Sequence, residues 1–187
     1  MSVLIVENDP DCAEVLECLV RGEVTDSSVW VASNGIEAIK TIERESPDIV
    51  FSELTLPRLN GLELAKRVRQ MPESASKYLC AVTGFTTGRY FETAIDSGFD
   101  HYVLKPFVAE DIGKVLTHAP SAPPWPQRLI WEYRNLKAEM TGAPTQQRLR
   151  IARELGVLRA QAQMKCCFST MEFENVVADA EVQLHMP

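Results

Sequence analysis

The chain has 187 residues, 45% of them hydrophobic, and a formal net charge of −7 at pH 7, which is typical of a globular protein. No apolar run approaches the roughly 20 residues that span a bilayer, and the sequence begins directly with an expected strand, so we expect no membrane segment, no signal peptide and a cytoplasmic location. The five cysteines have the spacing of neither a metal site nor a disulfide framework.

Apolar runs alternate with amphipathic segments through the first 119 residues. The expected strands are 3–6, 28–32, 49–52, 78–82 and 102–104. A helix is expected after each strand, with 34–45, 87–97 and 109–118 the clearest. The predicted buried stripes are Ile36, Ile39 and Ile42 in the second helix, and Leu62, Ala65 and Val68 in the third. This alternation predicts a doubly wound, five-stranded parallel sheet.

Polar residues follow four of these strands, at the edge where open parallel sheets bind ligands. They are Glu7, Asn8 and Asp9 after the first strand, Glu53 after the third, Thr83 after the fourth and Lys105 after the fifth. Asp9 precedes Pro10, so we expect it to start the next helix and not to bind metal. The set would bring carboxylates, an amide, a hydroxyl and an ammonium together.

In order and spacing, residues 2–118 resemble the receiver domain of two-component response regulators. The likeness includes the acidic cluster at Glu7 and Asn8, the Leu-Pro-x-x-x-Gly turn that ends at Gly61, and Tyr102 three residues before Lys105. The resemblance implies a Mg²⁺ site at the first cluster and a phosphoryl acceptor after the third strand.

The same resemblance assigns three switch residues. In the family, the residues matching Thr83 and Lys105 contact the phosphoryl group, and the aromatic residue matching Tyr102 changes rotamer on activation. Two positions depart from the family pattern, since Asn8 replaces an acid and Glu53 replaces the phosphoryl-accepting aspartate.

Both departures weaken the usual chemistry. Asn8 removes one negative charge from a site that Mg²⁺ needs, so we expect weak metal binding or none, and no other cofactor. Glu53 moves the carboxylate outward by about 1.5 Å, and errors of about 1 Å can slow a reaction on the order of a hundredfold. Phosphoryl transfer depends on positioning and metal electrostatics, so we expect no efficient phosphorylation at Glu53 and no enzymatic activity.

Glu53 could instead reach into the space of a phosphoryl group and pair with Lys105, with Thr83 as an added hydrogen-bond donor. The mimicry is incomplete, because a carboxylate has one charge and two oxygens where a phosphoryl group has nearly two charges and three oxygens. Either a partly or fully active resting state or an inert scaffold would follow.

Charge separates the rest of the chain from this first part. Residues 1–119 contain 11 Lys or Arg and 19 Asp or Glu, whereas residues 125–165 contain 8 and 3. Between them, 120–126 is a proline-rich linker that we expect to be stiff and extended. The expected organisation is a receiver-like domain at 1–119, this linker, and a helical extension at 127–187, which is acidic again from residue 166.

The extension predicts a helical hairpin. The helix expected at 127–140 carries an apolar seam that would pack against a partner helix. The seam consists of Leu129, Tyr133, Leu136 and Met140. Thr145 is an expected N-cap for a second helix from 146 to at least 165. Its predicted buried side consists of Leu149, Ala152, Leu155 and Leu158. So short a hairpin buries little alone, so we expect it to dock on the receiver or to form a homodimeric bundle.

An alternative for the second helix is DNA binding. The sequence 151–157 is similar to the turn of helix-turn-helix domains, and nearby arginines could contact phosphates. These are Arg148, Arg150, Arg153 and Arg159. However, Val157 is not followed by a Ser or Thr cap and a clear recognition helix. A continuous helix through Gly156 is also reasonable, because one glycine in a long helix costs only about 1 kcal/mol. The sequence therefore favours a phosphorylation-independent response regulator that acts through signalling-protein partners, with a DNA-binding transcription regulator as the alternative.

Overall fold

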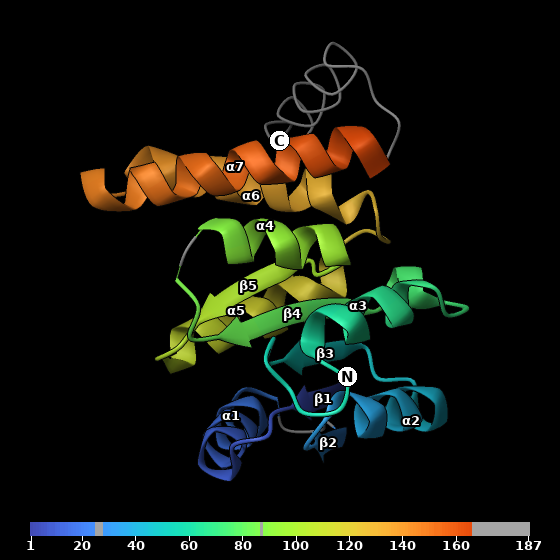
Figure 1. The fold of residues 1–187 in the computed structure, drawn as a ribbon. Coiled ribbons are helices and arrows are strands. Elements are labelled where there is room, and N and C mark those ends of the chain that lie inside the picture. The colour runs from blue at the N-terminus through green and yellow to red at the C-terminus, as the bar shows by residue number, and fades with distance from the viewer. Residues whose placement is uncertain (25–27, 87, 166–187) are drawn as a thin grey trace. The chain divides into compact units, whose positions relative to one another are not determined.

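The computed structural model describes residues 1–24, 28–86 and 88–165. The chain forms two compact units, residues 1–124 and 125–187, which we describe separately (Figure 1).

The first unit is built on a five-stranded parallel sheet, as the sequence predicts. Its strands are β1 (Ser2–Val6), β2 (Ser28–Ala32), β3 (Ile49–Ser52), β4 (Tyr78–Thr83) and β5 (His101–Leu104). The strand order is β2-β1-β3-β4-β5, so the chain reverses direction across the sheet beside β1 and β3. In such a sheet the ligand crevice lies outside the carboxyl ends of the strands at this reversal.

Helices cover both faces of the sheet (Figure 1). They are α1 (Pro10–Glu23), α2 (Gly35–Glu45), α3 (Gly61–Arg69), α4 (Gly88–Ser97) and α5 (Ala109–His118), with 3₁₀ turns at Ser74–Ser76 and Ala119–Ser121. Leu4 and Val50 point into the core under α2, α3 and α4, whereas Val3 and Phe51 point into the core under α1 and α5. Burial on both faces explains why β1, β3 and β4 are mainly apolar along their length.

Polar side chains set where three of the helices begin. Asp9 accepts hydrogen bonds from the backbone N–H groups of Asp11 and Cys12 and is the N-cap of α1, which confirms its expected role. Asn34 and Asn60 cap α2 and α3 in the same way. These caps fix the loops that follow β1, β2 and β3.

Two predicted stripes are partly wrong. Ile36 is 41% exposed, and the buried face of α2 is centred on Ala38 and Ile42. In α3, Leu64 is buried and Leu62 only partly so. The reason is geometric, because residues three apart repeatedly drift around a helix of 3.6 residues per turn, whereas mixed spacings of three and four stay on one face.

A buried ion pair joins the loops at the opposite edge of the sheet from the crevice. Arg69 Nη2 lies 2.6 Å from Asp100 Oδ2, and both side chains are nearly inaccessible. Arg69 also donates to the carbonyls of Gly98, Ser74 and Lys77. The pair therefore links the end of α3 to the segments that enter β4 and β5.

The second unit is a hairpin of α6 (Arg128–Gly142) and α7 (Thr145–Lys165). The predicted seam is confirmed for Tyr133, Leu136 and Met140, which pack against Ile151 and Leu155 of α7. Leu129 is also buried.

Three details of this unit differ from expectation. Ala152 is exposed, because the buried face of α7 follows the 4-3-4 spacing of Ile151, Leu155, Leu158 and Ala162. Helix α6 continues to Gly142, and α7 begins at Thr145, so Thr145 is the first helical residue and not the N-cap. The linker is not simply extended, since it starts in the 3₁₀ turn at Ala119–Ser121 and ends in a turn at 125–127.

The alternative prediction of a helix-turn-helix at 151–157 is wrong. Helix α7 runs without interruption through Gly156, where the alternative requires a turn between two helices. The cost of about 1 kcal/mol for a helical glycine is easily offset by the apolar residues buried on both sides of it. Within the described residues, no helix is both long and apolar enough to cross a membrane.

Candidate functional site

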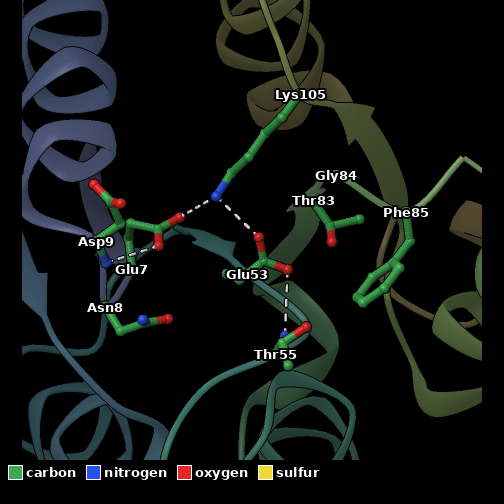
Figure 2. Close-up of a pocket in the computed structure, with 9 residues that line it drawn as sticks. All are labelled: Glu7, Asn8, Asp9, Glu53, Thr55, Thr83, Gly84, Phe85 and Lys105. Atoms are coloured by element: carbon green, nitrogen blue, oxygen red, sulfur yellow. Dashed lines mark hydrogen bonds and ion pairs between the residues drawn. The ribbon is translucent and has the colours of Figure 1, made fainter.

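A pocket of about 430 Å³ opens at the carboxyl ends of β1, β3, β4 and β5 (Figure 2). Its lining consists of Glu7, Asn8, Asp9, Glu53, Thr55, Thr83, Gly84, Phe85 and Lys105. The fold thus brings together the acidic cluster, Glu53, Thr83 and Lys105, although four different strands deliver them.

Glu53 is buried, and both oxygens of its carboxylate are engaged. Oε1 accepts hydrogen bonds from the backbone N–H groups of Leu54, at 2.6 Å, and Thr55, at 3.2 Å. Oε2 lies 2.9 Å from Lys105 Nζ, which confirms the expected ion pair. The extra methylene lets the carboxylate turn back onto its own backbone and still reach the lysine.

Lys105 bridges two carboxylates. Its Nζ also lies 2.5 Å from Glu7 Oε2, and Glu7 Oε1 accepts from the backbone N–H of Asp9. Burial by itself would lower the pKa of Lys105, but its hydrogen bonds to Glu7 and Glu53 and their negative charges outweigh burial and raise that pKa above its ordinary value. The ammonium therefore stays charged and holds the two acids together (Figure 2).

Thr83 does not make the hydrogen bond expected of it. Its side chain is fully buried at the pocket wall, yet Oγ1 has no hydrogen-bond partner among the residues that the structure describes. The donors that reach Glu53 are Lys105 and the two backbone N–H groups. The expectation of Thr83 as an added donor is therefore wrong for this arrangement.

Tyr102 is tied to the loop that follows β4. Its hydroxyl donates to the carbonyl of Phe85 at 2.7 Å, and its ring meets Phe91 of α4 edge-on. Phe85 in turn stacks on Tyr90, with ring centroids 4.1 Å apart. Phe85 connects the pocket to this aromatic group, because its side chain lines the pocket and its carbonyl accepts the hydrogen bond of Tyr102.

The acidic side chains of the pocket are engaged with partners other than a metal ion. Glu7 and Glu53 each direct one oxygen to the same ammonium, and Asp9 Oδ1 is occupied as a helix cap. Asn8 is exposed and brings an amide where a second carboxylate would be useful. Within the described part of the chain, no cluster of three His, Cys, Asp or Glu residues could hold a metal.

The arginines singled out for DNA contact lie on α7, in the second unit. Arg148 Nε donates to the carbonyl of Ala143 and closes the hairpin turn, and Arg150 pairs with Glu154 one turn away. Arg153 is exposed and Arg159 is half-buried. None of them belongs to the pocket.

Sequence reasoning missed three of the interactions made by Glu53 and Lys105. The first two are the backbone N–H groups of Leu54 and Thr55, which no side-chain pattern could announce. The third is the second partner of Lys105, Glu7, although opposite charges at neighbouring strand ends are a signal that could have suggested it. The loop after β3 also requires a glycine at position 61. A Cβ at Gly61 would lie 2.2 Å from the carbonyl oxygen of Glu53, so no side chain fits there.

Comparison with known proteins identifies the first unit. The response regulator receiver domain model matches residues 3–117. The chain belongs to this family. It is 34% identical over 106 residues to an uncharacterized 14.6 kDa protein of Leptolyngbya boryana, covering 57% of this chain and 79% of that protein.

Two further relatives likewise match only about 60% of this chain. The DNA-binding response regulator MtrA of Mycolicibacterium smegmatis is 30% identical over 110 residues, which are 59% of this chain but only 46% of MtrA. The crystal structure of a response regulator from Chloroflexus aurantiacus aligns with a TM-score of 0.59 and 29% identity, over 63% of this chain and 95% of that one. The chain thus spans less than half of MtrA, and α6 and α7 lie beyond the family match.

Proposed function

We propose that this receiver-family chain is an atypical response regulator that signals without phosphorylation, with the Glu53 carboxylate taking the place of a phosphoryl group. The observation that carries the proposal is the position of that carboxylate, 2.9 Å from Lys105 Nζ and within hydrogen-bond distance of two backbone N–H groups. A charged acceptor in that position occupies donors that an incoming phosphoryl group would need.

The lysine bridge also supports a metal-free pocket. A divalent cation between Glu7 and Glu53 would have to displace an ammonium already within 2.5 and 2.9 Å of their oxygens. Without Mg²⁺, transfer to a carboxylate loses its main electrostatic assistance. We therefore propose that the chain has no phosphotransfer activity of its own.

Glu53 provides an ion-pair partner for Lys105 but no hydrogen-bond partner for Thr83. A phosphoryl group has a third oxygen, whereas both oxygens of Glu53 are engaged and Thr83 Oγ1 is left without a partner. Tyr102 meanwhile is hydrogen-bonded to Phe85. These contacts support a receiver held in one fixed state that no kinase controls.

The output of the proposed regulator is protein contact. The receiver family consists of signalling modules, and the α6–α7 hairpin adds a helical surface that the family match does not include. We propose signalling-protein partners and a homodimer formed through this hairpin, which light scattering over a range of concentrations would test. The uninterrupted α7 gives no support to DNA reading by a helix-turn-helix.

The test restores what the pocket lacks. The double variant Asn8→Asp, Glu53→Asp should acquire Mg²⁺-dependent phosphorylation from acetyl phosphate, measured as a gain of one phosphoryl group by intact mass. The single variant Glu53→Asp is the matched control and should react poorly, because its metal site is still incomplete. If the double variant does not react while its thermal stability equals that of the wild type, departures elsewhere in the pocket, and not these two, disable the chemistry.

A further inference from the structure

The ammonium of Lys105 lies where a cation would bridge the ends of two neighbouring strands. Glu7 follows β1 and Glu53 follows β3, and these strands are paired as far as Val6 and Ser52. Glu7 Oε2 and Glu53 Oε2 converge on the same Nζ atom, at 2.5 and 2.9 Å (Figure 2). Carboxylate oxygens that converge on one point are also the ligands that a divalent cation prefers.

Backbone groups orient these two carboxylates independently of the lysine. Glu7 Oε1 accepts a hydrogen bond from the N–H of Asp9 at 3.0 Å. Glu53 Oε1 accepts from the N–H groups of Leu54 and Thr55. Each carboxylate is therefore held through one oxygen by its own loop and presents the other oxygen to the cation. Because the backbone donors remain, we expect the two converging oxygens to stay in place when the ammonium is removed.

Lys105 reaches these oxygens from a distant strand. It follows β5, which is separated from β3 by β4, and from β1 by both β4 and β3. Neighbouring strands lie about 4.8 Å apart, so the side chain has to extend past the end of β4. The lysine stem is flexible, and the Lys105 side chain keeps 20% of its exposure. The ammonium can therefore leave the acids for solvent while β5 stays in place.

The charge balance favours one cation at a time between these acids. Glu7 and Glu53 carry two negative charges, and Lys105 compensates one of them. A divalent ion in place of the ammonium would balance both, whereas ion and ammonium together would leave an excess of positive charge. Asn8 adds no charge that could hold both cations, and Asp9 is an exposed helix cap whose charge solvent screens.

A buried hydroxyl of the same pocket favours a hydrated ion. Thr83 lines the pocket and is fully buried, and its Oγ1 has no hydrogen-bond partner among the described residues. A hard cation such as Mg²⁺ keeps several of its waters when only one or two carboxylates bind it. One of these waters would supply the partner that Thr83 lacks.

On the basis of the proposed function, we further propose that Glu7 and Glu53 form a latent divalent-cation site. Lys105 keeps the site closed by placing its own ammonium between the two carboxylates. The pocket thus carries a permanent cation, and its contacts do not depend on the concentration of free metal ions. Loss of the lysine charge opens the site.

Manganese binding by the full chain tests this proposal, because Mn²⁺ takes the same oxygen ligands as Mg²⁺. Electron paramagnetic resonance measures the free Mn²⁺ during a titration without any phosphodonor. Lys105→Met should bind one Mn²⁺ at least about ten-fold more tightly than the wild type, a difference usual for coupled binding events. Lys114→Met removes an exposed lysine that pairs with Glu110, so it is the matched control and should bind like the wild type.

A second variant locates the ion. Adding Glu7→Gln to Lys105→Met should weaken Mn²⁺ binding by about ten-fold or more, because an amide replaces a charged ligand. MgCl₂ should raise the melting temperature of Lys105→Met but not that of the wild type, with NaCl at equal ionic strength as the control for screening. If Lys105→Met does not fold, Lys105→Gln takes its place, since it is also neutral and can donate a hydrogen bond to one acid.

Equal Mn²⁺ affinities of the wild type and the lysine variant would overturn the proposal. A folded lysine variant that binds no Mn²⁺, or whose affinity is unchanged by Glu7→Gln, would overturn it as well. Failure of the proposed function is a separate result, because it would appear as a phosphoryl group on the wild-type chain after incubation with acetyl phosphate.

Discussion

Replacing Lys105 by methionine removes the cation that Glu7 and Glu53 share while keeping an unbranched apolar side chain. The two carboxylates then face each other without an ammonium between them. We expect a large loss in the free energy of unfolding at pH 7, because two mostly buried charges lose their common partner.

The magnitude follows from the geometry. At 2.5 and 2.9 Å, an effective dielectric constant of about 20 gives gross attractions of about 7 and 6 kcal/mol. Desolvation offsets most of this, and breaking one partner of a buried pair costs about 3–5 kcal/mol. Because the Lys105 side chain keeps 20% of its exposure, we expect the lower end, about 3 kcal/mol.

Urea unfolding of Lys105→Met and of a matched control measures this loss. Lys114 pairs with Glu110 at 3.0 Å, and both side chains are exposed to solvent. Lys114→Met should therefore lower the free energy of unfolding by less than about 0.5 kcal/mol. A cost at Lys105 no larger than that of the control would refute the reasoning.

Three further predictions concern Lys105 at high pH, the buried Arg69–Asp100 pair and the glycine inside α7. Because its partners raise the pKa of Lys105 in the folded state, the stability it contributes should be full below about pH 10.4 and be lost as pH rises through the higher folded value; thermal melting of wild type and Lys105→Met should therefore converge at alkaline pH. Arg69→Ala leaves Asp100 buried without its cation and should cost about 3–5 kcal/mol in urea unfolding. Gly156→Ala lies in open space inside a continuous helix and should stabilise the hairpin by about 1 kcal/mol in thermal melts, whereas destabilisation would contradict the uninterrupted α7.

The sheet was predictable because burial on both faces leaves a strong signal. The runs 3–6 and 49–51 are continuously apolar, and each is closely followed by an acid, Glu7 or Glu53, that the fold places at one edge of the sheet. Helix faces were less predictable. Ile36 and Ala152 satisfy a spacing of three, yet both are exposed, because which apolar stripe is buried depends on how the helix is rotated against its neighbours.

The site was predictable in its membership but not in its bonding. The pairing of Glu53 with Lys105 follows from charge and topology. The backbone donors to Glu53, and the unbonded hydroxyl of Thr83, depend on side-chain rotamers and loop geometry that residue types do not encode.

The central claim is that Glu53 replaces a phosphoryl group and does not accept one. Intact mass of the wild-type chain after incubation with acetyl phosphate and Mg²⁺ tests this most directly. We predict an unchanged mass and an unchanged melting temperature. A stoichiometric gain of one phosphoryl group, mapped to Glu53 or a neighbouring acid, would contradict it.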